Sequence, residues 1–299
     1  MNDANHIRVA PTALLVAHFR RYGGDPLSEQ IAEATKARKA ALNFFDGDEE
    51  KLKQATAWIP LIIEMRQKGV NALVKMYFDQ TGHRNLFEVG AGVALENVND
   101  FARDNRVKHI LTDYSGDLVL AQRLLVEKFI PGTNGNLKIS RLNALDEHQT
   151  VGALEFFGGE PYAKTHLGIL PYFTVNQMAR YFEVSAKTMP PGSKIITTNI
   201  ITKDRVAMMI ANKPERAKLI AKIRGMTTEQ LFNDAYENDD QAIQQITNSG
   251  LRVEQRIPQY HGLGYNLSST ARIELEGIKV NQDDINVMGK RQIWIIAKD

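Results

Sequence analysis

Short runs rich in β-branched residues alternate with helical patterns along most of this chain after residue 84. Such runs are typical of buried strands, whereas the segments between them repeat apolar residues at three- and four-residue spacing, as amphipathic helices do. Strands separated by helices of about 10–15 residues indicate βαβ units, in which helices cover both faces of a parallel sheet. The sequence therefore predicts an α/β, Rossmann-like fold with a doubly wound, mostly parallel seven-stranded sheet. The expected strands are Asn85–Val89, Val107–Thr112, Leu137–Leu142, Tyr162–Ile169, Lys194–Ile200, Leu251–Ile257 and Gln292–Ala297.

Helical sequence also precedes and interrupts this alternating region. We expect an N-terminal helical cap over residues 1–82 and one α/β core over residues 83–299, with a helical insertion at about residues 203–248. The second helix of the insertion opens with a capping box at Thr227–Gln230. Imperfect alternation over Thr270–Val280 predicts an additional hairpin strand. The helices expected in the cap are Thr12–Arg21, Ser28–Phe45 and Glu49–Phe78, with breaks at Gly23–Pro26 and near Pro60.

Composition excludes several classes of function. The 299 residues include 37 Lys and Arg against 35 Asp and Glu, a net charge of +2 without a dense basic run, so nucleic acid is not an expected partner. The absence of cysteine excludes disulfides, thiolate nucleophiles and Cys-ligated metals, and we expect no metal. The most apolar windows, Trp58–Ile63 and Leu167–Phe173, fall far short of the roughly 18 residues that cross a bilayer. The first ten residues contain no apolar stretch typical of a secretory signal, so we expect a cytoplasmic protein that does not bind membranes. The sequence does not indicate the oligomeric state.

A glycine-containing turn is the most informative motif. The segment Glu88–Ala94 follows an expected strand and precedes a helix, which is the context of a nucleotide-binding turn. Gly90 can adopt backbone angles closed to other residues, and Gly92 allows a ligand to approach the main chain. Asp113 ends the next strand, where a carboxylate can accept hydrogen bonds from the ribose hydroxyls of an adenosine-containing ligand. A tight turn and a solvated aspartate without any ligand remain the alternative.

The identity of the adenosine ligand depends on the residues around the turn. A dinucleotide-binding turn has a third glycine, so that the helix packs closely beneath the pyrophosphate, but Leu95 stands at that position. Glu88 stands two residues before Gly90, where it would repel a pyrophosphate yet suit a ligand with an ammonium group. These features favour S-adenosylmethionine over NAD.

With these motifs the chain resembles the class I S-adenosylmethionine-dependent methyltransferases, and more narrowly the leucine carboxyl methyltransferase-like family with its small-molecule O-methyltransferase relatives. The likeness runs from about residue 11 to about residue 200. It rests on Thr12–Leu15, Arg20-Arg21, Asp25–Leu27, Glu88–Gly92, Gly168–Thr174 and Pro191–Ser193.

The resemblance implies a set of cofactor-binding residues. Asp113 takes the place of the ribose-binding acid, Asn143-Ala144 the place of residues that touch the adenine, and Arg66 that of an arginine that grips the cofactor carboxylate. Val93-Ala94 and Leu167 stand where the family commonly has acids, so we do not transfer its action on a protein-phosphatase tail. The predicted cofactor-binding residues are Arg66, Glu88, Gly90, Ala91, Gly92, Asp113, Tyr114, Asn143 and Ala144.

Few residues are candidates for the chemistry itself. If the resemblance holds, a substrate oxygen attacks the sulfonium methyl group, and a hydroxyl acceptor needs a base whereas a carboxylate does not. His166, at the end of the fourth expected strand, and His261, in the loop Tyr260–Tyr265, are the candidate bases, although His166 also suits a packed core position. Tyr172 and Tyr265 are the candidate substrate-binding residues.

Two other functions stay open at this level. An NAD(P)-dependent oxidoreductase would use the same glycine turn, although Leu95 and the late position of the turn disfavour it. A cofactor-binding protein without transferase activity is the third hypothesis, because no general base is obvious from the sequence. The leading expectation is an S-adenosylmethionine-dependent transfer of a methyl group to a carboxylate or hydroxyl oxygen of a small molecule.

Overall fold

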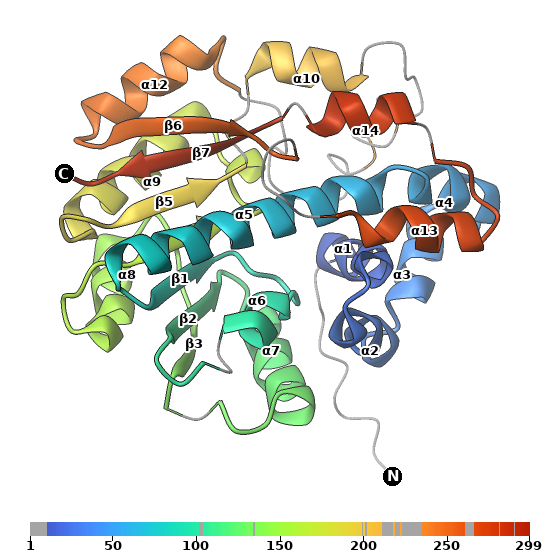
Figure 1. Ribbon diagram of the computed structural model, residues 1–299, viewed down its shortest axis with the longest axis horizontal. Coiled ribbons are helices and arrows are strands. Elements are labelled where there is room, and N and C mark those ends of the chain that lie inside the picture. Colours follow the sequence, from blue (N-terminus) through green and yellow to red (C-terminus); the bar gives the residue numbers. More distant parts are fainter. Residues whose placement is uncertain are drawn as a thin grey trace.

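The computed structural model describes residues 11–101, 104–133, 135–198, 200, 202–210, 218, 222, 235–260, 266–280, 282–289 and 291–299. Its centre is one seven-stranded sheet, so the predicted α/β fold and strand number are confirmed (Figure 1). The strands are β1 (Asn85–Val89), β2 (Lys108–Asp113), β3 (Leu137–Arg141), β4 (Ala163–His166), β5 (Lys194–Thr197), β6 (Arg252–Pro258) and β7 (Gln292–Ala297).

The order of strands across the sheet is β3-β2-β1-β4-β5-β7-β6. The first five of these strands are parallel, whereas β7 runs antiparallel to both β5 and β6. The chain moves outward from β1 in one direction, through β2 to β3, and then returns to place β4 on the other side of β1. This reversal lies at the carboxyl ends of β1 and β4, where open α/β sheets bind their ligands.

Helices cover both faces of the sheet. One face is covered by α5 (Ile59–Thr81), α6 (Glu96–Phe101) and α7 (Gly116–Phe129), and the other by α8 (Glu147–Leu154), α9 (Val175–Thr188) and α12 (Asp239–Asn248) (Figure 1). Val70 and Leu73 of α5 pack against Leu86 and Ile293, which shows how the apolar stripe of this helix binds it to the sheet. No helix of the described residues combines the length and the apolar character that a membrane span requires.

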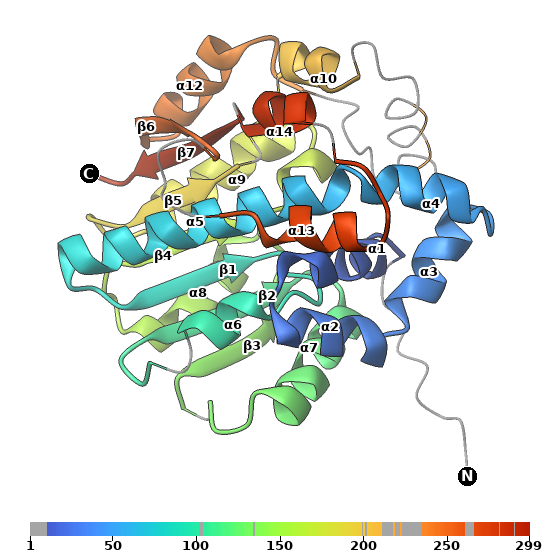
Figure 2. The same cartoon turned by 45° about the vertical axis from the view of Figure 1, so that its right-hand side comes forward.

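The N-terminal cap is built from four short helices at the end of the sheet to which the parallel strands point (Figure 2). They are α1 (Pro11–Arg20), α2 (Pro26–Ala34), α3 (Ala37–Phe44) and α4 (Glu49–Thr56). Asp25 caps α2 by accepting a hydrogen bond from the Leu27 amide. The helix predicted over Ser28–Phe45 is divided in two, because Lys36 adopts a left-handed backbone with φ 52°.

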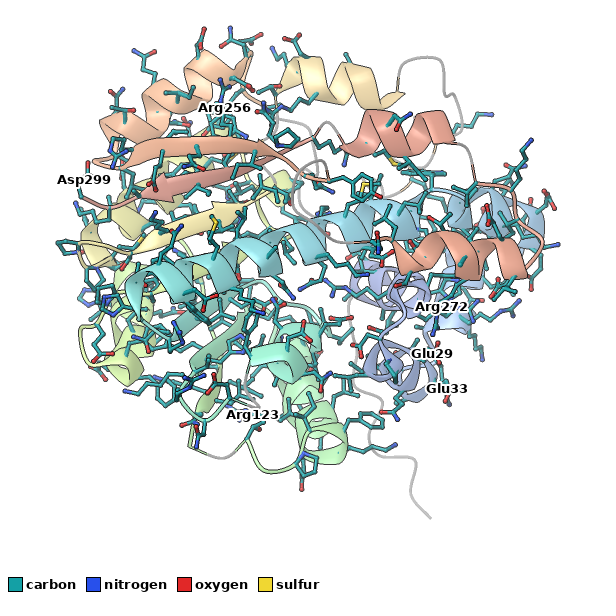
Figure 3. The ribbon with its side chains drawn as sticks, in the orientation of Figure 1. Glu29, Glu33, Arg123, Arg256, Arg272 and Asp299 are labelled. Atoms are coloured by element: carbon teal, nitrogen blue, oxygen red, sulfur yellow. The ribbon has the colours of Figure 1, made fainter. Side chains whose placement is uncertain are left out.

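The segment predicted as an additional strand is instead a helix, α13 (Ser268–Leu275). Glu64 of α5 explains the difference, since its carboxylate accepts hydrogen bonds from the amides of Ser268 and Ser269 at 2.8 and 2.9 Å and so caps the helix. Arg272 of α13 pairs with Glu29 of α2, and Figure 3 shows the two side chains meeting between the helices. The C-terminal part of the chain is thereby tied to the cap.

Two further helices, α10 (Lys203–Ile210) and α14 (Gln282–Gly289), lie near β6 and β7 (Figure 1). The helix α12 begins after Asn238, whose side chain accepts from the Gln241 amide. The predicted capping box at Thr227–Gln230 lies outside the described residues.

Candidate functional site

The glycine turn joins β1 to the region of α6 and is fixed by contacts to its neighbours. Gly90 and Gly92 have φ angles of 68° and 62°, in the left-handed region that favours glycine. The Ala91 amide donates to the Thr112 carbonyl of β2 at 3.0 Å. The Gln122 side chain of α7 donates to the Gly92 carbonyl at 2.6 Å. The turn is therefore held in one conformation by the next strand and the next helix.

The two glycines differ in the space around them. A Cβ atom at Gly90 would lie 1.8 Å from Cγ2 of Ile169, in the loop after β4, whereas one at Gly92 would lie 3.8 Å from Cβ of Ala13 in α1. Gly90 is thus required by a close approach as well as by its backbone angle. Gly92 leaves room beside the main chain.

We expect Gly90→Ala to lower the free energy of unfolding by about 3 kcal/mol or more, because left-handed strain and the overlap with Ile169 add together. Gly92→Ala, the matched control, carries only the strain and should cost about 1–2 kcal/mol. Urea unfolding measures both values. Equal losses in the two variants would contradict the packing assigned to Ile169, whereas partial recovery in Gly90→Ala/Ile169→Ala would support it.

Asp113 ends β2 directly beside this turn. Its two carboxylate oxygens accept hydrogen bonds from the amides of Gly92 and Ser115 at 3.0 and 3.1 Å. Burial raises the pKa of the Asp113 carboxyl, and the backbone donors act in the opposite direction. The sequence predicted Asp113 at the end of the strand that follows the glycine turn, and the structure joins Asp113 to the turn through a direct hydrogen bond.

The next strand adds Asn143 and Ala144 to the same edge of the sheet. The Leu142 amide donates to the Asp113 carbonyl at 2.9 Å, which places the residues that follow β3 beside the end of β2. Asn143 closes a turn by accepting from the Leu145 amide, and Ala144 is buried. Tyr114 is 59% exposed, and its ring lies beneath the Arg141 guanidinium. These three predicted residues therefore adjoin Asp113.

Glu88 lies on the face of the sheet covered by α5 and α6, away from solvent. One of its carboxylate oxygens accepts a hydrogen bond from the Asn97 side chain at 2.9 Å and lies 3.4 Å from Nε2 of His109. The side chain is 3% exposed. A direct contact of Glu88 with a cofactor stays a prediction, and the structure shows contacts to α6 and β2.

Arg66 reaches from α5 to the carboxyl ends of β4 and β5. Its Nε donates to the hydroxyl of Thr198 at 3.2 Å, and a Cβ at Gly168 would lie 3.9 Å from its Nη2. Burial lowers the pKa of Arg66 to about 9, with a further contribution from Arg291. Among the described residues no carboxylate pairs with this guanidinium, so it presents a cation that an anionic group could complement.

Tyr172 belongs to the same loop as Gly168 and Ile169. Its amide donates to the Ile169 carbonyl at 2.9 Å, and its side chain lies within electrostatic range of Arg66. The predicted substrate-binding residue thus lies near the predicted carboxylate partner. His261 and Tyr265 lie outside the described residues.

His166 is completely buried at the end of β4. Its Nδ1 lies 3.0 Å from the Thr197 hydroxyl of β5, and its ring meets that of Tyr181 edge to face. Burial and the neighbouring Lys164 lower the pKa of the imidazole well below its usual value, so the ring is neutral. A general base must reach the proton that it removes, and the observed position is that of a packed histidine.

Sequence reasoning missed three residues that shape this region. Gln122 donates a hydrogen bond to the glycine turn, and Thr198 accepts one from Arg66. Neither residue belongs to a recognisable motif. Lys164 is buried in β4, where its ammonium group donates to the Ser185 hydroxyl at 2.8 Å and lies 4.3 Å from the centre of the Tyr181 ring. Its place two residues before His166, on the same face of the fourth expected strand, was the available signal.

The comparisons with known proteins give structures but no sequence family. No protein-family model matches the chain, and neither does any curated protein. A provisionally assigned methyltransferase from Thermobifida fusca YX superposes with a TM-score of 0.56 at 13% identity, over 97% of this chain and 94% of that one. The chain has the class I methyltransferase fold. An O-methyltransferase family protein from Burkholderia thailandensis is also similar, with a TM-score of 0.50 at 13% identity, over 90% of this chain and 62% of that one.

The class I methyltransferase fold confirms the predicted resemblance at the level of architecture. In this chain the glycine turn after β1 and Asp113 at the end of β2 lie beside the reversal of strand order. The candidate site is thus the carboxyl edge of β1, β2 and β4.

Proposed function

We propose that the protein is an S-adenosylmethionine-dependent methyltransferase that transfers a methyl group to a carboxylate or hydroxyl oxygen of a small molecule. The observation that carries this proposal is the hydrogen bond between the Gly92 amide and Asp113. It places an acid suited to ribose hydroxyls directly beside a turn whose main chain a ligand can approach.

The residues present fit this cofactor better than a dinucleotide. Leu95 stands where a dinucleotide-binding turn has its third glycine, and its side chain is fully buried against Val98 and Leu111. A dinucleotide-binding turn uses a glycine at this position so that the helix packs closely against the strand beneath the pyrophosphate, and the Leu95 side chain occupies that place here. Asp113 would hold the ribose, Tyr114, Asn143 and Ala144 would surround the adenine, and Arg66 would pair with the amino-acid carboxylate.

When bound, S-adenosylmethionine supplies an electrophilic methyl group on its sulfonium sulfur. The contribution of the chain is to position the reactants and to exclude water, and alignment of this kind can lower a barrier by about 7–11 kcal/mol. Ala13 of α1 and Ile169 after β4 approach the glycine turn from two directions. We propose that the helical cap predicted over residues 1–82 acts as a lid over the bound molecules through α1–α4, since α5 packs along the sheet.

A carboxylate acceptor would need no base, whereas a hydroxyl acceptor must lose a proton. We propose that His166 acts in the core, where it joins the ends of β4 and β5 through Thr197, rather than as that base. Tyr172, His261 and Tyr265 stay predictions for the acceptor side of the site.

The test is the transfer of label from methyl-labelled S-adenosylmethionine to the small molecules of a cell extract. We expect label in at least one product with wild-type protein and roughly background label with Asp113→Ala, because the ribose contact is lost. Transfer that needs no Asp113, or no transfer by folded protein that binds S-adenosylhomocysteine, would contradict the proposal.

A further inference from the structure

A continuous series of polar contacts joins the cap to the strand that carries the glycine turn. Arg20 of α1 pairs with Glu96 of α6 and donates to the Gln67 side chain of α5 at 3.1 Å. The Gln67 amide in turn donates to the side-chain oxygen of Asn97 in α6. Asn97 then donates to Glu88 of β1. Four elements that surround the turn are thereby connected through side chains.

Glu88 and Asn97 lie on opposite sides of the glycine turn in the sequence. Glu88 stands two residues before Gly90, and Asn97 stands five residues after Gly92. Their 2.9 Å hydrogen bond therefore joins the end of β1 to the start of α6. Both side chains are nearly inaccessible, at 3% and 2% exposed. This hydrogen bond sets the distance between the end of β1 and the start of α6, which are the two ends of the glycine turn.

The buried pair of Glu88 and Asn97 is a poor source of folding stability. A buried carboxylate costs free energy unless it is fully paired, and apolar residues of similar shape often serve stability as well or better. Within the described part of the chain, no lysine or arginine pairs with Glu88, whose partners are the Asn97 amide and His109. A role in holding the geometry of the turn accounts for the pair better than stability does.

Gln67 connects these contacts to Arg66, the residue predicted to bind the carboxylate of the cofactor. It directly follows Arg66 in α5, and its side chain contacts both Asn97 and Arg20. A displacement of Asn97 would therefore disturb its contact with Glu88 before the turn and its contact with Gln67 of α5. The contacts place Asn97 at the junction of the cap, α5 and β1.

We propose that Asn97 is a positioning residue that sets cofactor affinity by fixing the glycine turn through Glu88. The inference rests on the proposed function, and it assigns Glu88 an indirect role in place of a direct cofactor contact. The bound molecule meets the turn and Asp113, while Asn97 and Glu88 determine the shape that the turn presents.

The test swaps the amide and the carboxylate groups between positions 97 and 88. Asn97→Asp puts two carboxylates face to face, so we expect S-adenosylhomocysteine to bind at least about 10-fold more weakly by calorimetry. The double variant Glu88→Gln/Asn97→Asp restores one amide donor and one carboxylate acceptor, and its affinity should return to within about threefold of wild type. Asn99→Asp, the same change two residues along α6, is the control and should bind normally.

A second readout needs no ligand. Asn97→Asp should speed amide hydrogen exchange in the segment Gly90–Leu95 of the free protein, and the double variant should reverse this. If Asn97→Asp does not fold, Asn97→Ser, which is too short to reach Glu88, should show the same exchange and a weaker affinity.

Three results would overturn the inference. They are unchanged exchange and affinity in Asn97→Asp, a double variant that stays as weak as the single one, and a loss confined to variants of Glu88, which would indicate direct contact. Wild-type protein that fails to bind S-adenosylhomocysteine would instead contradict the proposed function, and the exchange data would still decide the role of Asn97.

Discussion

Replacing Asp113 with alanine should weaken the binding of S-adenosylhomocysteine roughly 30- to 300-fold, which corresponds to about 2–3.4 kcal/mol. Two hydrogen bonds from ribose hydroxyls to a charged acceptor would be lost. The variant also loses the acceptor for the Gly92 amide, so the turn itself becomes less well held. Calorimetric titration of folded protein gives the affinity directly.

The matched control for this change is Asp117→Ala, in the first turn of α7. It removes one carboxylate from the same part of the chain without touching the turn, so its affinity should stay within about twofold of wild type. Circular dichroism and a urea midpoint show whether each variant is folded. Equal affinities of Asp113→Ala and Asp117→Ala would remove the ribose-binding role from Asp113.

Replacing Lys164 with methionine should raise the free energy of unfolding at pH 7 by roughly 3–5 kcal/mol. Burial lowers the pKa of the Lys164 ammonium from 10.5 to about 7, and each pKa unit corresponds to about 1.36 kcal/mol. Its surroundings are a serine hydroxyl and aromatic rings, and no carboxylate of the described residues pairs with it. Methionine has a similar length and carries no charge into this core.

The pH dependence of this effect has a definite sign. Between pH 7 and pH 10.5 the unfolded chain holds a proton on Lys164 that the native protein has released, so wild-type stability rises with pH through this window. Below pH 7 the full penalty of the buried charge is present. The advantage of Lys164→Met should therefore shrink by several kcal/mol from pH 7 to pH 10.5.

Urea unfolding at a series of pH values measures this difference. The comparison of two proteins cancels the titration of the shared groups that Lys164 does not contact. Lys53→Met, a change of the same kind at an exposed position of α4, should shift stability by less than about 0.5 kcal/mol at every pH. Parallel stability curves for wild type and Lys164→Met would contradict the lowered pKa of the buried Lys164 side chain.

The sheet was predictable because each strand corresponds to a local run of apolar and β-branched residues. The bounds of β1 and β7 match the apolar runs expected from the sequence, whereas β4 is shorter than its expected run at both ends, and Ile169 of the loop after β4 lies over Gly90. The strand predicted over Thr270–Val280 was wrong for a nonlocal reason. Glu64, some 200 residues earlier in the chain, caps this segment as a helix, and no local pattern contains that information.

The site was predictable to the extent that it follows strand ends. Gly90, Gly92 and Asp113 meet because parallel strands align their carboxyl ends, a rule that applies without knowledge of side-chain packing. The contacts of Glu88 with Asn97 and the burial of His166 depend on which face of the sheet each residue occupies and on which helix covers it. Those properties arise from packing between distant segments, so the sequence named the residues but not their partners.

The central claim is that the glycine turn and Asp113 bind the adenosine part of S-adenosylmethionine. Calorimetric titration of the wild-type protein with S-adenosylhomocysteine, alongside fluorescence titration with NADH and NADPH, tests it most directly. We expect saturable binding of S-adenosylhomocysteine at one site per chain and no saturable signal with either nicotinamide. Saturable binding of NADH or NADPH, with no binding of S-adenosylhomocysteine by folded protein, would contradict it.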